Sequence, residues 1–339
     1  MYKRQRVATA GTRLPTDATT TDVTGPPLSQ RRLRFVLGKG GVGKSTVAAA
    51  LGLAAARAGG RALVVEVAGQ HRLSQLFSAA RVEDDAPTEL RPGLFGISID
   101  AEQATEEYLA GQLKIRPLVE LLTHSKAFHT FAAAAPGLPE LVTIGKVWSL
   151  AIALREDGSG PLWDTVTVDC PATGHGIALL ETAGNIEELA AGGPIRDQAA
   201  RIQEVVSHPA ATGIVIVARP QELAIAEAIE ATATLRGHGL PVAAAVLNGV
   251  HPERFSPGDA PALTTVAEDP GPLGEAARAA LRHLERQEED HAYRERLAAE
   301  SGLPVIDLPR VVRRRIDLEA LELLADVLAV GVPGAEEVR

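Results

Sequence analysis

Cysteine is almost absent from this sequence, because its 339 residues include only Cys170. A single cysteine excludes an intrachain disulfide and any zinc or iron–sulfur site built from several thiolates of one chain. The chain also has one methionine and only 3% aromatic residues. Alanine, leucine and valine must therefore fill most of the core, and the abundance of alanine favours helices.

Long apolar runs and an excess of positive charge are missing as well. No stretch of about 18 apolar residues suggests a membrane span, and the N-terminus lacks the apolar core of a signal peptide. The net charge of −9 argues against nucleic-acid binding. We therefore expect a cytoplasmic protein. Basic clusters in residues 3–34 and 313–315 are interpreted as solvated, the alternative being weak contact with an anionic membrane or partner.

The first 30 residues differ in composition from the rest of the chain. They are rich in Thr, Pro, Gly and Arg without periodicity, which predicts a disordered arm over 1–30 and a folded domain over 31–339. Short apolar runs then alternate with helical patterns. We predict strands at 33–37, 61–67, 95–100, 163–168, 213–218, 241–247 and 304–308. We predict helices at 44–58, 101–111, 139–155, 220–236, 272–299 and 316–329.

This alternation predicts an α/β fold with a mostly parallel sheet and helices on both faces. The stretch 101–160 interrupts the alternation with helical signals alone, and a second helical segment occupies 176–207. We interpret these two stretches as an inserted helical subdomain.

A phosphate-binding loop follows the first predicted strand. The residues GKGGVGKS match G-x-x-x-x-G-K-[ST] between a strand and a helix, which is the context that this motif requires. Glycines let successive backbone N–H groups point inward, a lysine reaches the outer phosphates, and a serine hydroxyl binds Mg²⁺. The residues predicted to bind the nucleotide are Gly38, Gly40, Gly41, Val42, Gly43, Lys44, Ser45 and Thr46.

Two further residues complete the predicted site. Lys39 stands at a loop position that does not need a lysine, so we expect it to reach the nucleotide of a facing subunit, as an arginine finger does. Asp169 ends an apolar strand, where a carboxylate can hold Mg²⁺ through water. The Thr-Gly that follows predicts a loop that moves when the γ-phosphate leaves.

These motifs resemble the ArsA/Get3 family of ATPases, whose wider class carries the lysine-bearing "deviant" phosphate loop. The resemblance rests on GKGGVGKST, on DCPATGH from Asp169 to His175, and on Asn248 in VLNG, and it extends over roughly 33–330. The shorter, actinobacterial-type members are the most similar. The resemblance implies ATP, ADP and Mg²⁺ as ligands, a dimer that opens and closes, Asn248 at the adenine edge, Lys39 at the partner's nucleotide and Asp169 as the metal-linked switch residue.

The sequence departs from the family where an aspartate positions the attacking water. In VEVAGQH the expected position is Ala68, which cannot orient water, and Glu66 or His71 is left as a substitute. Glu66 has a catalytic and a structural interpretation. Two functions follow: an ATPase that couples hydrolysis to the handling of a client protein, or a hydrolysis-poor regulatory subunit of a heterodimer with a catalytic paralogue.

The sequence leaves the nature of any client open. A groove that adapts to different apolar clients usually contains several flexible methionine side chains, and this chain has one methionine. Helices at 117–135 and 139–155 carry apolar residues at helical spacing, which fits either a buried subdomain core or a client groove. The zinc clamp of eukaryotic-type members is not expected, because the chain has no Cys-x-x-Cys pair.

Overall fold

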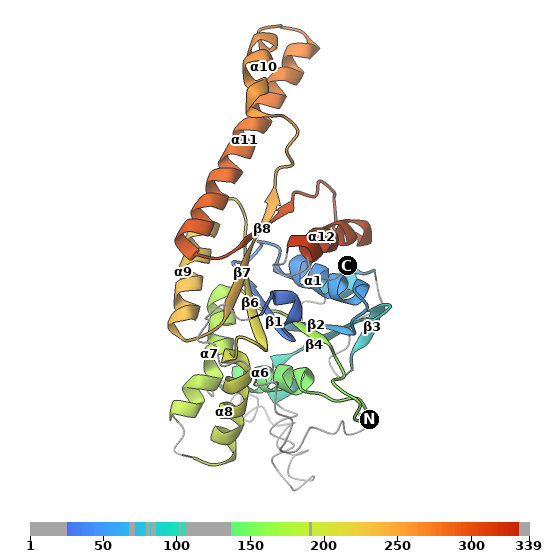
Figure 1. The fold of residues 1–339 in the computed structure, drawn as a ribbon, viewed down its shortest axis with the longest axis vertical. Coiled ribbons are helices and arrows are strands. Elements are labelled where there is room, and N and C mark those ends of the chain that lie inside the picture. Colours follow the sequence, from blue (N-terminus) through green and yellow to red (C-terminus); the bar gives the residue numbers. More distant parts are fainter. Residues whose placement is uncertain are drawn as a thin grey trace.

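A mostly parallel sheet organises the molecule. The computed structural model describes residues 26–67, 72–78, 82, 86–101, 103–105, 137–189 and 192–331. Within them, eight strands pair in the order β3-β4-β2-β5-β1-β6-β7-β8, and only β3 and β4 are antiparallel (Figure 1). The strands are β1 (Leu33–Gly38), β2 (Ala62–Val67), β3 (Thr88–Arg91), β4 (Leu94–Ile99), β5 (Thr165–Asp169), β6 (Thr212–Ala218), β7 (Val242–Val250) and β8 (Val305–Pro309).

Helices cover both faces of the sheet, as expected for the α/β fold of a P-loop NTPase. Successive β1 side chains point to opposite faces: Val36 packs with α1 and α12, while Phe35 and Leu37 pack with α6, α7, α8 and α9. The helices are α1 (Lys44–Arg57), α2 (Arg72–Leu76), α6 (Leu138–Ala151), α7 (Thr173–Leu189), α8 (Pro194–Ser207), α9 (Glu222–Gly237), α10 (Ala260–Ala267), α11 (Pro272–Ser301) and α12 (Leu318–Gly331), with 3-10 turns η1 (Leu28–Gln30) and η2 (Pro257–Asp259).

Each predicted strand is present with small shifts at its ends, whereas β3 was not predicted. In β3 only Leu90 is buried, and its neighbours are polar or charged. A short polar strand at the edge of a sheet lacks the apolar run that identifies the buried central strands. Composition therefore gives little signal for this strand.

The helical predictions need two corrections. The segment 176–207 is two helices, because Gly192 and Gly193 adopt positive φ and Pro194 starts α8. The helix predicted at 139–155 ends at Ala151, and residues 153–162 fold back through a bridge between Leu154 and Pro161. The short helices α2 and α10 were not predicted.

Part of the predicted subdomain lies outside the described residues. Of the helix expected at 101–111, residues 101 and 103–105 are described and are helical. The helix expected at 117–135 falls within 106–136 and is not described.

The N-terminal boundary of the folded domain lies earlier than the sequence indicated. Residues 1–25 lie outside the described residues, but η1 is folded and Leu28 is only 3% exposed. The Leu28 side chain packs over Gly213 of β6, where a Cβ would meet Leu28 Cδ1 at 2.7 Å. The disordered arm predicted over 1–30 is therefore corrected at its end, since a single apolar residue in a Pro-rich segment gives no periodic signal.

A long helical arm extends beyond the sheet. Helices α10 and α11 pack side by side, and their outer part projects from the body at the end opposite to α6 and α8 (Figure 1). The base of the arm is anchored where Asp290 of α11, 5% exposed, lies 2.7 Å from the His251 backbone nitrogen and 2.8 Å from His251 Nδ1. Among the described residues no helix is both long enough and apolar enough to cross a membrane.

The packing of Leu28 gives a stability prediction. We expect Leu28→Ala to lower the free energy of unfolding by about 2–4 kcal/mol, because a buried leucine side chain is replaced by a cavity. Urea unfolding followed by circular dichroism measures this change. The matched control is Val312→Ala, whose parent side chain is 82% exposed and should leave the stability unchanged. Equal stability of both variants would show that η1 does not belong to the folded domain.

Candidate functional site

The phosphate loop lies at the carboxyl end of β1, in the centre of the sheet. Gly38 and Gly43 have φ values of +152° and +100°, a region that side chains other than glycine's rarely adopt. A Cβ on Gly38 would lie 2.2 Å from the Val217 carbonyl oxygen, so β6 leaves no room for one. At Gly40 and Gly41 such a Cβ would meet no atom of the described residues within 4 Å apart from those of its chain neighbours, so this side of the loop is open to a ligand.

Lys44 is the first residue of α1 and stays close to its own loop. Its Nζ donates a hydrogen bond to the Lys39 carbonyl oxygen at 3.1 Å. Burial lowers the pKa of the ammonium group, and the nearby Asp169 carboxylate partly opposes this effect. A half-buried lysine at the start of a helix, above an open loop, is suited to binding phosphate oxygens.

Strand pairing brings two carboxylates together beside the loop. Asp169 of β5 pairs in register with both Val36 of β1 and Glu66 of β2. Glu66 and Asp169 are 1% and 5% exposed. The pKa of Asp169 is raised to about 6, chiefly by burial; the neighbouring Glu66 also raises it, while the nearby Ser45 hydroxyl and Lys44 lower it.

The donor set beside the loop fits Mg²⁺. Asp169 Oδ1 is buried and accepts no hydrogen bond from the described residues, which leaves one oxygen for a further ligand. The Ser45 hydroxyl is near enough to the same carboxylate to lower its pKa. Carboxylate and hydroxyl oxygens are hard donors, and Mg²⁺ usually takes one or two of them and completes its shell with water and phosphate. The arrangement therefore matches a metal that is held jointly by the protein and a nucleotide.

Glu66 has a visible structural role. Its Oε1 accepts a hydrogen bond of 2.7 Å from the backbone N–H of Arg72, the first residue of α2. This contact ties the segment after β2 to the strand end. His71, the other substitute for water activation, lies outside the described residues, as does Ala68 at the expected aspartate position.

Lys39 contacts its own subunit in this single chain. Its Nζ forms an ion pair with Glu227 Oε1 of α9, and both side chains are about one-third exposed. Sequence reasoning did not identify Glu227, since no motif marks it. The reach of Lys39 toward a facing nucleotide stays a prediction.

Asn248 joins β7 to the phosphate loop. Its Nδ2 donates to the Val42 carbonyl oxygen at 2.7 Å. A Cβ on Gly43 would lie 2.2 Å from this Nδ2, so the loop needs glycine at that position. The family resemblance assigned Asn248 to adenine alone, and its contact with the loop was not predicted. The structure thus brings Asn248 together with the phosphate-binding residues.

An open cleft of about 780 Å³ begins at the first turn of α1. The residues that line it include Ser45, Thr46, Arg72 and Arg315. Neither arginine was predicted as a site residue: Arg315 was interpreted as part of a solvated basic cluster, and no pattern marked Arg72. Only the tertiary structure shows that the two arginines line the same cleft.

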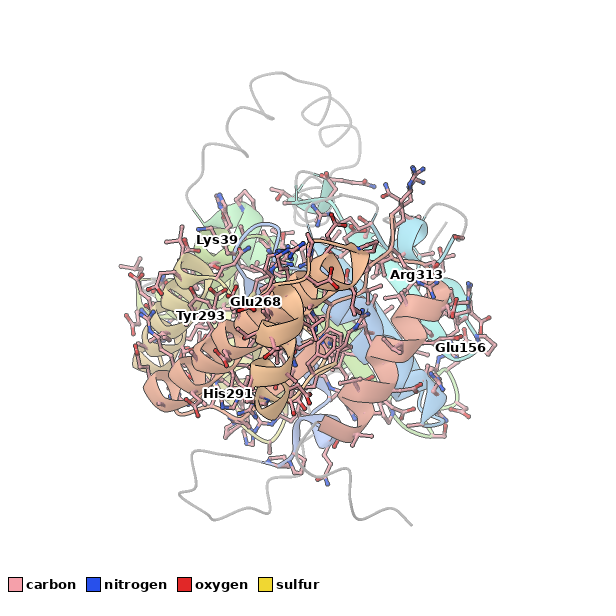
Figure 2. All side chains as sticks on the ribbon, turned by 90° about the horizontal axis from the view of Figure 1, so that it is seen from above. Lys39, Glu156, Glu268, His291, Tyr293 and Arg313 are labelled. Carbon is pink, nitrogen blue, oxygen red and sulfur yellow. The ribbon has the colours of Figure 1, made fainter. Side chains whose placement is uncertain are left out.

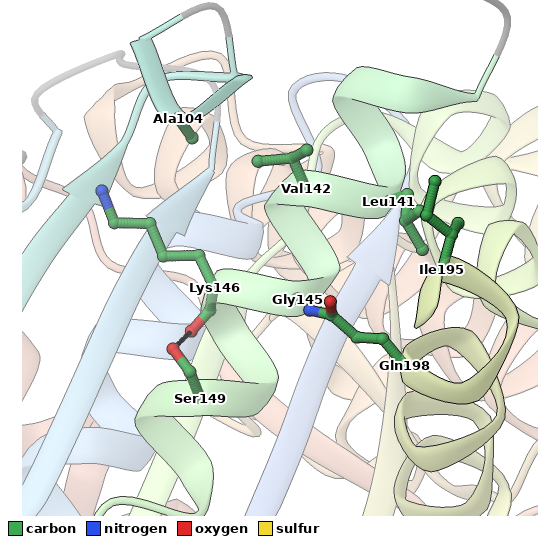
Figure 3. Close-up of a pocket in the computed structure, with 8 residues that line it drawn as sticks. All are labelled: Ala104, Leu141, Val142, Gly145, Lys146, Ser149, Ile195 and Gln198. Carbon is green, nitrogen blue, oxygen red and sulfur yellow. Dashed lines mark hydrogen bonds between the residues drawn. The ribbon is translucent and has the colours of Figure 1, made fainter. Parts of the chain in front are cut away.

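A second, apolar groove lies away from the nucleotide loop. Leu141 and Val142 of α6 and Ile195 of α8 line a space of about 320 Å³, with Lys146 at its rim (Figure 3). Ile195 is 50% exposed, whereas Leu141 and Val142 are each 7% exposed and Ile144 and Val147 of α6 are fully buried. The exposed apolar surface of this groove therefore comes mainly from Ile195 of α8.

The raised pKa of Asp169 predicts a pH-dependent stability of the ligand-free protein. The folded pKa of about 6 lies above the ordinary value of 3.8, so this group contributes full stability below pH 3.8 and the contribution is lost as pH rises through 6. We expect the free energy of unfolding of Asp169→Asn to rise by about 1 kcal/mol relative to that of wild type as the pH increases from about 5 to about 8. Urea unfolding without Mg²⁺ or nucleotide measures the gain. The exposed-carboxylate control Glu230→Gln should show none, and a constant difference for Asp169→Asn would contradict the burial argument.

Several known proteins are similar to this chain in sequence. A model of the anion-transporting ATPase family (ArsA ATPase) matches residues 31–191. The chain is 32% identical over 236 residues to "ATPase BagA" of Mycobacterium tuberculosis, which covers 68% of this chain and 69% of that protein.

More distant relatives have related names. The "arsenical pump-driving ATPase" of Escherichia coli is 28% identical over 234 residues, covering 64% of this chain and 39% of that protein. The "ATPase GET3" of Podospora anserina is 28% identical over 163 residues, or 48% of this chain and 46% of that protein. With the phosphate loop, Asp169 and the parallel sheet in place, the chain belongs to the ArsA/Get3-like family of ATPases.

Proposed function

We propose that this protein is a dimeric switch that binds ATP with Mg²⁺, hydrolyses it and couples the cycle to the handling of a client protein. One observation carries the proposal: the open phosphate loop lies directly beside the buried Asp169 carboxylate, whose Oδ1 accepts no hydrogen bond from the described residues. A nucleotide and its metal would supply the missing partners.

The loop residues have distinct tasks in this proposal. The backbone N–H groups from Gly40 to Ser45 hold phosphate oxygens, assisted by the N-terminal end of α1. Lys44 leaves the Lys39 carbonyl to bind the outer phosphates. Ser45 and Asp169 hold the metal, which when bound neutralises charge that develops on the transferred phosphoryl group.

Two residues connect the nucleotide to larger changes. Asn248 holds the Val42 carbonyl and is proposed to bind the adenine edge when a nucleotide enters. Lys39 is proposed to leave Glu227 and bind the nucleotide of a facing subunit, an identical chain or a paralogue. The ion pair with Glu227 supports this step indirectly, because it shows that the Lys39 side chain finds its charge partner outside its own phosphate loop.

The client is proposed to occupy the apolar groove between α6 and α8. The half-exposed Ile195 provides apolar surface, with the largely buried Leu141 and Val142 beneath it, and such grooves accept apolar side chains of a partner. The names of the relatives are compatible with several kinds of client, so its identity is left to experiment.

A hydrolysis-poor nucleotide-binding subunit is the second candidate function. It is favoured by Ala68, which stands where the family carries a water-positioning aspartate, and by Glu66, one oxygen of which already accepts the Arg72 N–H. In this version a catalytic paralogue completes a heterodimer, and this chain acts as its regulatory partner.

A binding and turnover experiment separates the two functions. We expect wild-type protein to bind ATP·Mg²⁺ and to release phosphate, and Lys44→Ala to lose at least about tenfold in affinity and all turnover, because the outer phosphates lose their cation. Calorimetry and a phosphate-release assay measure both. Tight binding without turnover above the Lys44→Ala blank would favour the regulatory subunit, and no binding at all would reject both functions.

The ion pair between Lys39 and Glu227 predicts how readily the dimer forms. We expect Glu227→Gln to increase ATP-dependent dimerisation several-fold, since Lys39 no longer leaves an ionic partner on its own subunit. Lys39→Ala should abolish the nucleotide-dependent part. Analytical ultracentrifugation with and without ATP·Mg²⁺ measures these effects.

The matched control for this experiment is Glu230→Gln on the exposed side of the same helix. It should behave like wild type. Dimerisation that does not respond to nucleotide in any of the proteins would argue against a trans role for Lys39.

A further inference from the structure

The cleft at the start of α1 contains two cations that the phosphate loop does not supply. Arg72 and Arg315 come from separate elements, the start of α2 and the loop between β8 and α12, yet both line the space above Ser45 and Thr46. Neither guanidinium has an ion pair or hydrogen bond with another described residue. Both side chains are exposed to the cleft, and two positive charges that share a cleft favour the binding of an anion there.

Arg313, in the same loop as Arg315, does have ionic partners, so the lack of a partner is not common to all arginines of this loop. Its guanidinium bonds to Asp317 at 2.7 Å and to Glu319 at 2.9 Å. Seen from above, Arg313 and Lys39 lie on opposite sides of the helical arm (Figure 2). Arg313 is thus committed to the start of α12, while Arg315 faces the cleft.

Helix packing places Arg315 beside the first turn of α1. Arg57 at the end of α1 forms an ion pair of 2.9 Å with Asp326 in the second half of α12. Arg315, just before α12, lines the cleft with Thr46 at the beginning of α1. The two helices therefore run in the same direction, and their starts lie together. In a loop of this type the backbone N–H groups hold the α- and β-phosphates while the lysine reaches the outer ones, so a cation beside Thr46 is assigned to the phosphates that Lys44 does not reach.

Arg72 lies near the two strand-end carboxylates, Glu66 and Asp169. Its backbone N–H is bonded to Glu66, which is the register neighbour of Asp169 on β5. The positive charge of Arg72 acts on both Asp169 and Lys44, lowering the pKa of each. Its guanidinium is therefore close to the groups that bind the metal and the outer phosphates.

A charge count shows why the site has room for both arginines. ATP carries about four negative charges and Mg²⁺ cancels two of them. Ionised Glu66 and Asp169 add two more, and Lys44 cancels only one. Buried charge without a partner of opposite sign is unfavourable. Arg72, Arg315 and one Lys39 from a facing subunit would bring the site close to neutrality.

We propose that Arg72 and Arg315 are positioning residues that bind the nucleotide's phosphate chain within their own subunit. Arg315 holds the phosphate next to the ribose, and Arg72 holds the outer phosphates on the side of Asp169. This inference rests on the proposed function, because it requires ATP in the phosphate loop. It gives the chain two cations that act before any partner subunit arrives.

Nucleotide titration of the full chain tests the assignment. Calorimetry would measure the affinities for AMP, ADP and ATP with Mg²⁺ in Arg72→Gln, Arg315→Gln and the adjacent, exposed control Arg314→Gln. We expect Arg315→Gln to weaken all three nucleotides by a similar factor of about ten, and Arg72→Gln to weaken ATP about tenfold more than AMP. Arg314→Gln should match wild type.

Salt dependence provides a readout that a purely structural role would not change. Each of the two cleft variants should show a shallower fall of ATP affinity with NaCl concentration, because one charge contact is lost. Circular dichroism spectra and unfolding midpoints equal to wild type would establish that the variants fold.

The outcomes distinguish this inference from the proposed function. If wild type binds ATP and both arginine variants bind all three nucleotides as wild type does, with an unchanged salt slope, the inference is wrong while the proposed function stands. Equal losses in Arg314→Gln would also overturn it, since the effect would then be one of general surface charge. Failure of wild type to bind ATP would instead remove the proposed function itself.

Discussion

The close approach of the phosphate loop to two neighbouring strands is the constraint on which the site depends. At Gly38 the β6 carbonyl of Val217, and at Gly43 the amide of Asn248 on β7, would each lie 2.2 Å from a Cβ. Both positions also have positive φ, so only glycine satisfies them without strain. With the loop held in this way, Lys44 and Ser45 emerge from the first turn of α1 toward Asp169.

Charge accumulates at this edge of the sheet for a topological reason. Parallel strands end at the same edge, so the strand-end residues Glu66 and Asp169 become neighbours although β2 and β5 are far apart in sequence. Burial of the Asp169 carboxylate is unfavourable until a cation approaches it. Two cations, Lys44 and Arg72, act on this carboxylate, as expected for a site whose ligand carries both phosphate and metal.

A chain of ion pairs links the phosphate loop to the arm. Lys39 contacts Glu227 of α9, and Glu222 at the start of the same helix lies 2.6 Å from Arg296 of α11. The base of α11 is in turn held by Asp290 beside the ends of β7 and β8. A displacement of α9 would therefore change the contacts of the arm as well as those of Lys39. In the proposed switch, these contacts connect the phosphate loop to the arm.

The α/β class, the glycine-rich loop after the first strand and the place of Asp169 at a strand end were determined by the sequence alone, because apolar periodicity and glycine spacing are local properties. The polar edge strand β3, the folding of Leu28 onto β6 and the split between α7 and α8 carry weak or ambiguous local signals. Only the tertiary structure decided that Asn248 holds Val42 and that Lys39 contacts Glu227, across separations of 206 and 188 residues. It also decided that Arg72 and Arg315 share one cleft, because contacts between distant segments depend on how the layers pack and not on the pattern of either segment.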